Sequence, residues 1–366
     1  MNRLKTLSEH GQAVWLDYIR RDLLNDGSLE SMVREDAVTG VTSNPAIFKQ
    51  AIAESSLYDA ALASELAADP GASVMDLYET LAIEDIRLAA DILSSVYDTT
   101  SGADGFVSLE VSPHLARDTE GTLAEARRLW ARVDRPNLMI KVPATAEGIP
   151  AIEDLLADGI NVNVTLMFSL AHYEAVAQAY LRGLSRAERP DAVASVASFF
   201  VSRVDSKIDA LLDAEGTDAA QALKGKIGIA NSKAAYARYR ELFEGETFAG
   251  LAARGARPQR PLWASTSTKN SDYRDVLYVE ELVGPNTVNT IPPATLEAFR
   301  DHGESRDSLG EDTDAAFAQL EALGRVGIDL GEATEALQRE GVDAFVKPFD
   351  VLLETLRAKR DEVLAA

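Results

Sequence analysis

Eight short apolar runs, rich in Val, Ile, Leu and Phe, alternate with longer amphipathic stretches along the 366 residues of the chain. The runs cover residues 13–18, 38–43, 105–111, 138–143, 160–168, 194–201, 261–266 and 286–291. Several are almost continuously apolar, which is typical of parallel strands covered by helices. Eight alternations of strand and helix favour an α/β fold of the closed (β/α)8 barrel type over an open doubly wound sheet.

The stretches between these runs carry apolar residues at three- and four-residue steps, which predicts helices over residues 122–133, 150–157 and 169–184. Two connections, residues 45–104 and 204–260, are long enough to hold additional helices. Residues 341–366 are predicted to form a C-terminal helix, and its inward face is Phe345, Phe349, Leu352, Leu353 and Leu356. No domain boundary is evident, so we expect residues 1–366 to form one barrel domain decorated by these insertions.

Composition excludes several classes of protein. The absence of cysteine rules out a disulfide framework, a thiolate nucleophile and a zinc–thiolate site. The net charge of −23 disfavours nucleic-acid binding. No apolar run reaches the length of about 18 residues that a membrane helix needs, and the N-terminus lacks the apolar core of a signal peptide. We therefore expect a cytoplasmic protein that binds neither nucleic acid nor membranes; its oligomeric state, monomer or homodimer, stays open.

Metal and nucleotide sites also lack a signature in the sequence. The four histidines, His10, His114, His172 and His302, do not occur at the spacing of metal ligands. Neither a P-loop nor a G-x-G-x-x-G motif is present. We therefore expect no metal ion and no cofactor.

Alternation along each strand indicates which side chains enter the barrel. In 160–168, Val162, Val164, Leu166 and Phe168 are assigned to the helix layer, whereas Asn161, Asn163, Thr165 and Met167 share the inward parity. In 261–267, Leu262, Ala264 and Thr266 alternate with Trp263, Ser265 and Ser267.

Polar side chains of inward parity gather near the C-terminal ends of several strands: Asp17, Asn44, Glu110, Lys141, Asn163 and Thr165. Barrel enzymes build their active sites at this end. A charged group inside a barrel is costly unless it is paired, so the set as a whole indicates function.

Lys141 suggests the chemistry. Burial in an apolar strand disfavours a charged amine, and a neutral lysine amine attacks a carbonyl to form a Schiff base. The protonated imine withdraws electrons, so a neighbouring C–C bond can break or form without a metal or an organic cofactor. Glu110 and Asp17 are the candidate proton carriers, Asn44 and Asn163 could hold sugar hydroxyls, and Thr165 could position a water.

The residues resemble the transaldolase family. The matching stretches are Thr42-Ser43-Asn44-Pro45, Val107-Ser108-Leu109-Glu110-Val111, Ile140-Lys141-Val142-Pro143-Ala144-Thr145, Gly159-Ile160-Asn161-Val162-Asn163-Val164-Thr165-Leu166-Met167-Phe168-Ser169, Ser198-Phe199-Phe200-Val201-Ser202-Arg203-Val204-Asp205 and Ala264-Ser265-Thr266-Ser267. They occur in order and cover most of residues 13–293. The resemblance implies a (β/α)8 barrel of the Schiff-base aldolase group.

The resemblance also implies a role for each matched residue. Lys141 matches the Schiff-base lysine, Asp17 the carboxylate that exchanges the proton of the C4 hydroxyl, and Glu110 with Thr165 the pair that moves protons through water. By the same resemblance, the substrate-binding residues are Asn44, Asn163 and Ser198 for the dihydroxyacetone portion, Phe200 for an aromatic wall, and Arg203 with Ser265 for the phosphate.

One position departs from the family pattern. Classical members carry an arginine two residues after the position of Ser265, where this chain has Ser267, followed by Lys269. Sequences of this kind resemble a longer bacterial branch, and we hypothesise that Ser267 and Lys269 replace the second arginine. Lysine is a point charge rather than a bidentate fork, so the grip on phosphate would be looser.

The resemblance implies transfer of a dihydroxyacetone unit from sedoheptulose 7-phosphate or fructose 6-phosphate to an aldose phosphate, in the non-oxidative pentose phosphate pathway. A related aldolase that releases free dihydroxyacetone is the first alternative, because it shares the lysine. A catalytically inactive sugar-phosphate-binding barrel is the second, and intact Lys141, Glu110 and Asp17 argue against it.

Overall fold

The computed structural model describes residues 2–365, and its eight strands close into one parallel barrel in sequence order. The strands are β1 (Gln12–Leu16), β2 (Val38–Thr42), β3 (Phe106–Glu110), β4 (Leu138–Pro143), β5 (Val162–Met167), β6 (Ser195–Phe200), β7 (Arg260–Ala264) and β8 (Thr287–Ile291). No strand extends more than one residue outside its predicted run. The predicted (β/α)8 barrel is therefore confirmed.

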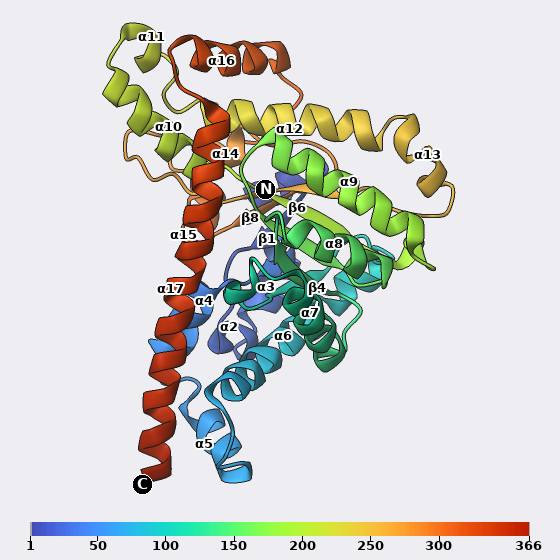
Figure 1. Cartoon of the computed structure of the whole chain (residues 1–366), viewed down its shortest axis with the longest axis vertical. Helices are drawn as coiled ribbons and strands as arrows, with labels where there is room; N and C mark the ends of the chain where they lie inside the picture. Colours follow the sequence, from blue (N-terminus) through green and yellow to red (C-terminus); the bar gives the residue numbers. More distant parts are fainter. Residues whose placement is uncertain (1, 366) are drawn as a thin grey trace.

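Helices surround the barrel (Figure 1). They are α1 (Arg3–Glu9), α2 (Arg21–Asn25), α3 (Ser28–Asp36), α4 (Pro45–Phe48), α5 (Asp59–Ala68), α6 (Val74–Thr99), α7 (Thr119–Val133), α8 (Gly148–Ala157), α9 (Leu170–Arg186), α10 (Ser202–Glu215), α11 (Asp218–Gln221), α12 (Ile227–Phe243), α13 (Glu246–Ala252), α14 (Leu277–Glu280), α15 (Pro293–His302), α16 (Thr313–Arg325) and α17 (Leu330–Ala365). The long connections hold α4 to α6 and α10 to α13, as expected. None of the described helices has the length and apolar character needed to cross a bilayer.

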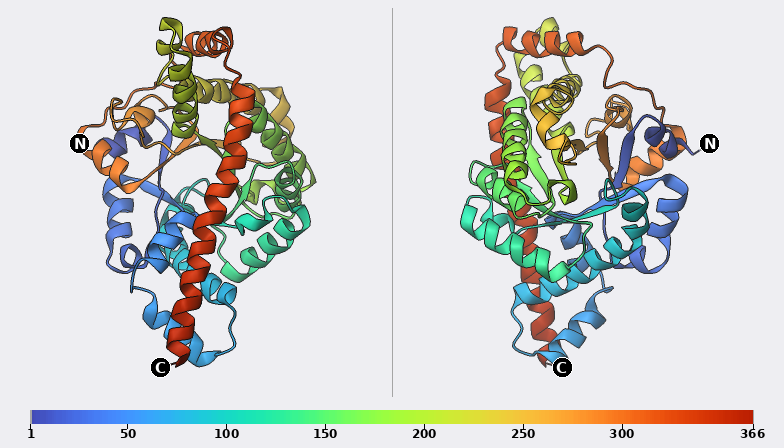
Figure 2. Two further views of the ribbon diagram at one scale, coloured as in Figure 1. Left: turned by 60° about the vertical axis from the view of Figure 1, so that its left-hand side comes forward. Right: turned by 90° about the vertical axis from the view of Figure 1, so that its right-hand side faces the viewer.

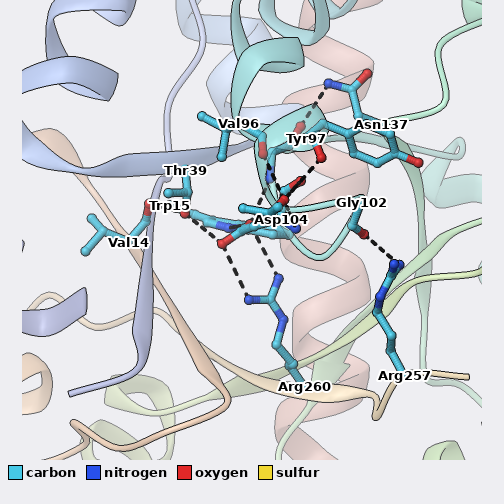
Figure 3. A network of polar contacts seen from close by, with 12 residues as sticks. Val14, Trp15, Thr39, Val96, Tyr97, Gly102, Asp104, Asn137, Arg257 and Arg260 are labelled. Carbon is cyan, nitrogen blue, oxygen red and sulfur yellow. Dashed lines mark hydrogen bonds and ion pairs between the residues drawn. The ribbon is translucent and has the colours of Figure 1, made fainter. Parts of the chain in front are cut away.

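The N-terminal end of the barrel, its floor, is closed by a polar network around Asp104 (Figure 3). The Asp104 carboxylate accepts hydrogen bonds from Trp15 Nε1 at 2.9 Å and from Thr39 Oγ1 at 2.9 Å, and the Arg260 guanidinium lies 3.4 Å away. These groups come from β1, β2 and β7 and from the loop before β3, so the network ties four parts of the barrel together. Above the floor, large apolar side chains fill the barrel: Trp15, Phe106, Met139, Val196, Leu262 and Val288.

Helix α17 runs along most of the length of the molecule and crosses the opposite end, the mouth (Figures 1 and 2). It begins at Leu330, so the predicted start at residue 341 is wrong; the predicted end, Ala366, lies outside the described residues. Gly341 lies inside this helix, where the helix passes close to β5. A Cβ at Gly341 would lie 2.9 Å from Leu166 Cδ2.

The alternation of inward-facing and outward-facing side chains along β5 ends after Thr165. Leu166 has φ +58°, and the pairing with β6 shifts at this point. Leu166 consequently joins the apolar cluster of Phe168, Phe200 and Phe345, whereas Met167 packs with Val162 and Val164 in the helix layer. The predicted sides of Leu166, Phe168 and Met167 are therefore wrong, because the strand becomes irregular at Leu166.

Candidate active site

Lys141 stands at the mouth between two polar neighbours on adjacent strands. The register pairs Glu110 of β3 with Lys141 of β4, and Lys141 with Asn163 of β5. The Lys141 ammonium donates a hydrogen bond to the Ser43 carbonyl at 3.0 Å, and it lies 3.6 Å from Glu110 Oε2. Only 6% of Lys141 is exposed, so the predicted buried, inward-facing lysine is found.

The two carboxyl groups of the mouth both have a raised pKa. Burial raises the pKa of Glu110 to about 7, although the positive charge of Lys141 opposes the shift. Burial also raises the pKa of Asp17, against the charge of Lys141 and a 2.8 Å hydrogen bond from Thr42 Oγ1. A carboxyl group with a pKa near 7 can give and take protons at neutral pH, as a general acid–base catalyst must.

A cavity of about 180 Å³ opens at the mouth, and ten of the predicted site residues line it: Asp17, Asn44, Lys141, Thr165, Ser198, Phe200, Arg203, Ser265, Ser267 and Lys269. Glu110 lies beside it, against Lys141. Asn163 lies beneath it: its side chain donates to Ser108 Oγ at 3.0 Å and accepts from Ser198 Oγ at 2.6 Å. The predicted set is thus brought together, with Asn163 supporting Ser198.

Local structure fixes the orientation of two of these side chains. Asn44 caps α4, and its Oδ1 accepts from the backbone amide of Ile47 at 3.0 Å, which leaves its Nδ2 directed elsewhere. Ser265 has φ +58°, so its side chain does not follow the alternation of β7 and reaches the cavity next to Ser202 Oγ at 2.8 Å.

Two cations of the cavity make no ion pair with any carboxylate of residues 2–365. Arg203 stacks on Phe200, with its guanidinium 5.1 Å from the ring centroid. Lys269 Nζ donates to Ser267 Oγ at 2.8 Å. In a chain with 59 acidic residues, two free cations facing one cavity form a suitable site for an anion.

Five lining residues were not predicted as part of the site: Thr42, Ala264, Thr290, Pro292 and Phe345. Phe345 of α17 lies 5.8 Å from Lys141 Nζ and 5.9 Å from the Arg203 guanidinium. Thr42 and Thr290 share a 2.7 Å hydrogen bond next to Asp17. The helical periodicity predicts that Phe345 faces inward, but its position over Lys141 depends on how α17 crosses the mouth. Thr42 could have been found from its position two residues before Asn44, which gives it the same parity.

Within residues 2–365 no three His, Cys, Asp or Glu side chains gather as metal ligands would. The expectation of a metal-free and cofactor-free site stays a prediction.

Comparison with known proteins decides the family. The family model described as transaldolase/fructose-6-phosphate aldolase matches residues 14–356. The chain belongs to this family. A protein named transaldolase from Thermobifida fusca is 52% identical over 356 residues, which are 96% of each chain. One from Thiobacillus denitrificans is 50% identical over 357 residues, 96% of this chain and 99% of the relative.

A third protein named transaldolase, from Mycolicibacterium smegmatis, is 48% identical over 363 residues, 98% of this chain and 97% of the relative. The resemblance read from six short motifs is therefore confirmed at the level of the family. Transaldolase/fructose-6-phosphate aldolase, the description of this family, includes both the predicted activity and its first alternative.

Proposed function

We propose that the protein is a transaldolase of the non-oxidative pentose phosphate pathway, acting in the cytoplasm. It transfers a dihydroxyacetone unit from sedoheptulose 7-phosphate or fructose 6-phosphate to glyceraldehyde 3-phosphate or erythrose 4-phosphate. The observation that carries the proposal is a buried lysine amine 3.6 Å from a carboxyl group whose pKa is about 7. The relatives that cover nearly the whole chain are named transaldolase, which favours transfer over simple cleavage.

The first step forms a covalent bond between Lys141 and the ketose. The neutral amine attacks C2, and the resulting carbinolamine loses its hydroxyl as water when Glu110 supplies a proton. Thr165 Oγ1 is buried without a hydrogen-bond partner in the described part of the chain, as is Glu110 Oε2. Both can therefore bind the water through which this proton moves.

The second step breaks the C3–C4 bond. Asp17 takes the proton of the C4 hydroxyl, the oxygen becomes a carbonyl, and the bonding electrons move towards the protonated imine. An aldose phosphate leaves, and an enamine of three carbons stays on Lys141. The acceptor aldehyde adds to the enamine, Asp17 returns the proton, and water releases the new ketose.

The phosphate binds where Arg203 and Lys269 line the cavity. Arg203 and Lys269 supply two charges that no carboxylate of residues 2–365 neutralises, and Ser265 and Ser267 add hydroxyl donors. Lys269 then takes over part of the role of the family's second arginine. Lys269→Ala should raise the KM for the ketose phosphate about tenfold, as expected for a lost charge-assisted hydrogen bond; an unchanged KM contradicts this assignment.

Reductive trapping tests the covalent step. Borohydride is added to the protein with fructose 6-phosphate, and peptides are mapped by mass. We expect a three-carbon adduct on Lys141 and none on the other lysines, with the Lys141→Met variant unlabelled. An adduct elsewhere, or none, contradicts the proposal.

Measuring free dihydroxyacetone without an acceptor separates transfer from the aldolase alternative. Phe200 is 6% exposed, its ring lies 5.0 Å from Phe168, and it brings no hydroxyl to the cavity. An apolar wall activates water poorly, so we expect slow release without acceptor and fast turnover with it. Equal rates would favour the aldolase.

A further inference from the structure

The loop that carries Ser267 and Lys269 has little structure of its own. Residues 265–276 join β7 to α14 and contain neither helix nor strand. Ser265 and Thr266 are held at the start, by Ser202 and by Asn289. Arg274 is held at the end, by Glu280.

Between these ends, a single hydrogen bond ties the loop to the rest of residues 2–365. Tyr273 Oη donates to Asp209 Oδ2 at 2.6 Å. The other hydrogen bonds of residues 267–273 stay inside the loop: Lys269 to Ser267, the Asp272 amide to Asn270 Oδ1, and the Tyr273 amide to the Asn270 carbonyl. The position of Lys269 relative to the cavity therefore depends on this tyrosine.

The acceptor of this bond lies on the helix that carries the other phosphate cation. Asp209 follows Arg203 on α10, is 8% exposed, and is itself held because its Oδ1 accepts from the Gly225 amide at 3.0 Å. Ser202, the first residue of α10, also contacts the loop through Ser265. Helix α10 thus holds the loop at two points and presents Arg203 at the same cavity.

We propose that Tyr273 and Asp209 are positioning residues for phosphate recognition: their hydrogen bond holds the loop so that Lys269 and Ser267 line the same cavity as Arg203. This inference rests on the proposed function, because it assigns the phosphate group of the substrate to these cations. Tyr273 and Asp209 do not line the cavity, so they act through the loop and not on the substrate.

The test is Tyr273→Phe, which removes the hydroxyl and keeps the ring. Because the loop loses this hydrogen bond, we expect the KM for glyceraldehyde 3-phosphate and the inhibition constant of inorganic phosphate to rise about tenfold. The KM for unphosphorylated glyceraldehyde and kcat should stay within about twofold, because the lysine chemistry is untouched.

Tyr236→Phe is the matched control. Its hydroxyl donates at 3.1 Å to the Pro285 carbonyl, outside the loop, and it should leave all four constants unchanged. The inference is overturned if Tyr273→Phe leaves the phosphate-dependent constants unchanged, or raises the KM for glyceraldehyde equally. Borohydride trapping on Lys141 remains independent of either result, so a failure of the proposed function is recognised separately.

Discussion

The two ends of the barrel each hold a buried carboxyl group and a cation, but the hydrogen bonding of the carboxyl group differs between them. At the floor, Asp104 accepts from Trp15, Thr39 and the Gly105 amide, and Arg260 lies beside it (Figure 3). At the mouth, Glu110 Oε2 has no hydrogen-bond partner within residues 2–365 and lies 3.6 Å from Lys141.

Because of this difference, the charged groups at the floor stabilise the structure, whereas those at the mouth can take part in a reaction. Satisfied buried charges fix geometry, whereas an unsatisfied carboxyl group loses solvation without compensation and retains its proton more readily. The raised pKa of Glu110 is the result of that burial. The unsatisfied groups at the mouth thus lower the stability of the protein but can react. The satisfied groups at the floor do not react, and they hold β1, β2 and β7 together.

Removing the cation at each end should give the largest contrast. Lys141→Met should reduce kcat at least about 10⁴-fold, because no other group can form the Schiff base. Arg260→Met should keep kcat per folded molecule within about twofold, since the floor takes no part in the reaction. Steady-state assays on both variants, with circular dichroism to check folding, would contradict the comparison if both lost activity equally.

Glu110→Gln should lower kcat about 100-fold or more, the usual contribution of a general acid–base group. It should also stabilise the protein above pH 7. The folded-state pKa of about 7 exceeds the ordinary 4.5, so the folded protein binds more protons and loses stability as the pH rises from about 4.5 to 7. This shift corresponds to about 3 kcal/mol.

Urea denaturation of wild type and Glu110→Gln at pH 5 and pH 8 measures this effect. The variant should gain in free energy of unfolding relative to wild type at pH 8, and less at pH 5. An equal difference at both pH values would mean that burial of Glu110 does not perturb its ionisation.

Asp104→Asn should have the opposite effect to Glu110→Gln: it should lower stability and leave kcat unchanged. Loss of the charge weakens the interactions with Arg260 and Thr39, and we expect a loss of about 1–3 kcal/mol in the free energy of unfolding with kcat unchanged. Asp98→Asn, an exposed position at the end of α6, should change stability by less than about 0.5 kcal/mol. A kcat that falls with Asp104→Asn would show that floor and mouth are coupled.

Periodicity predicted the parts of the molecule that follow a regular repeat. The eight strands and the side-by-side placement of Glu110, Lys141 and Asn163 follow from parity and parallel pairing. The exceptions, Leu166 and Ser265, have positive φ values that no repeat reveals. Phe345 was missed as a site residue for another reason: its role depends on the path of α17, which only the packed structure sets.

Gly341→Ala tests that path and should have the smallest effect. Alanine favours a helix by up to about 1 kcal/mol over glycine, but its Cβ would press on Leu166, directly after Thr165. Because the end of a leucine side chain can shift, we expect stability to change by less than about 1 kcal/mol and kcat to fall about threefold as Thr165 moves. Gly324→Ala in α16, where a Cβ meets nothing within 4 Å, should stabilise without changing kcat. Identical behaviour of the two variants would mean that α17 covers the mouth without influencing its chemistry.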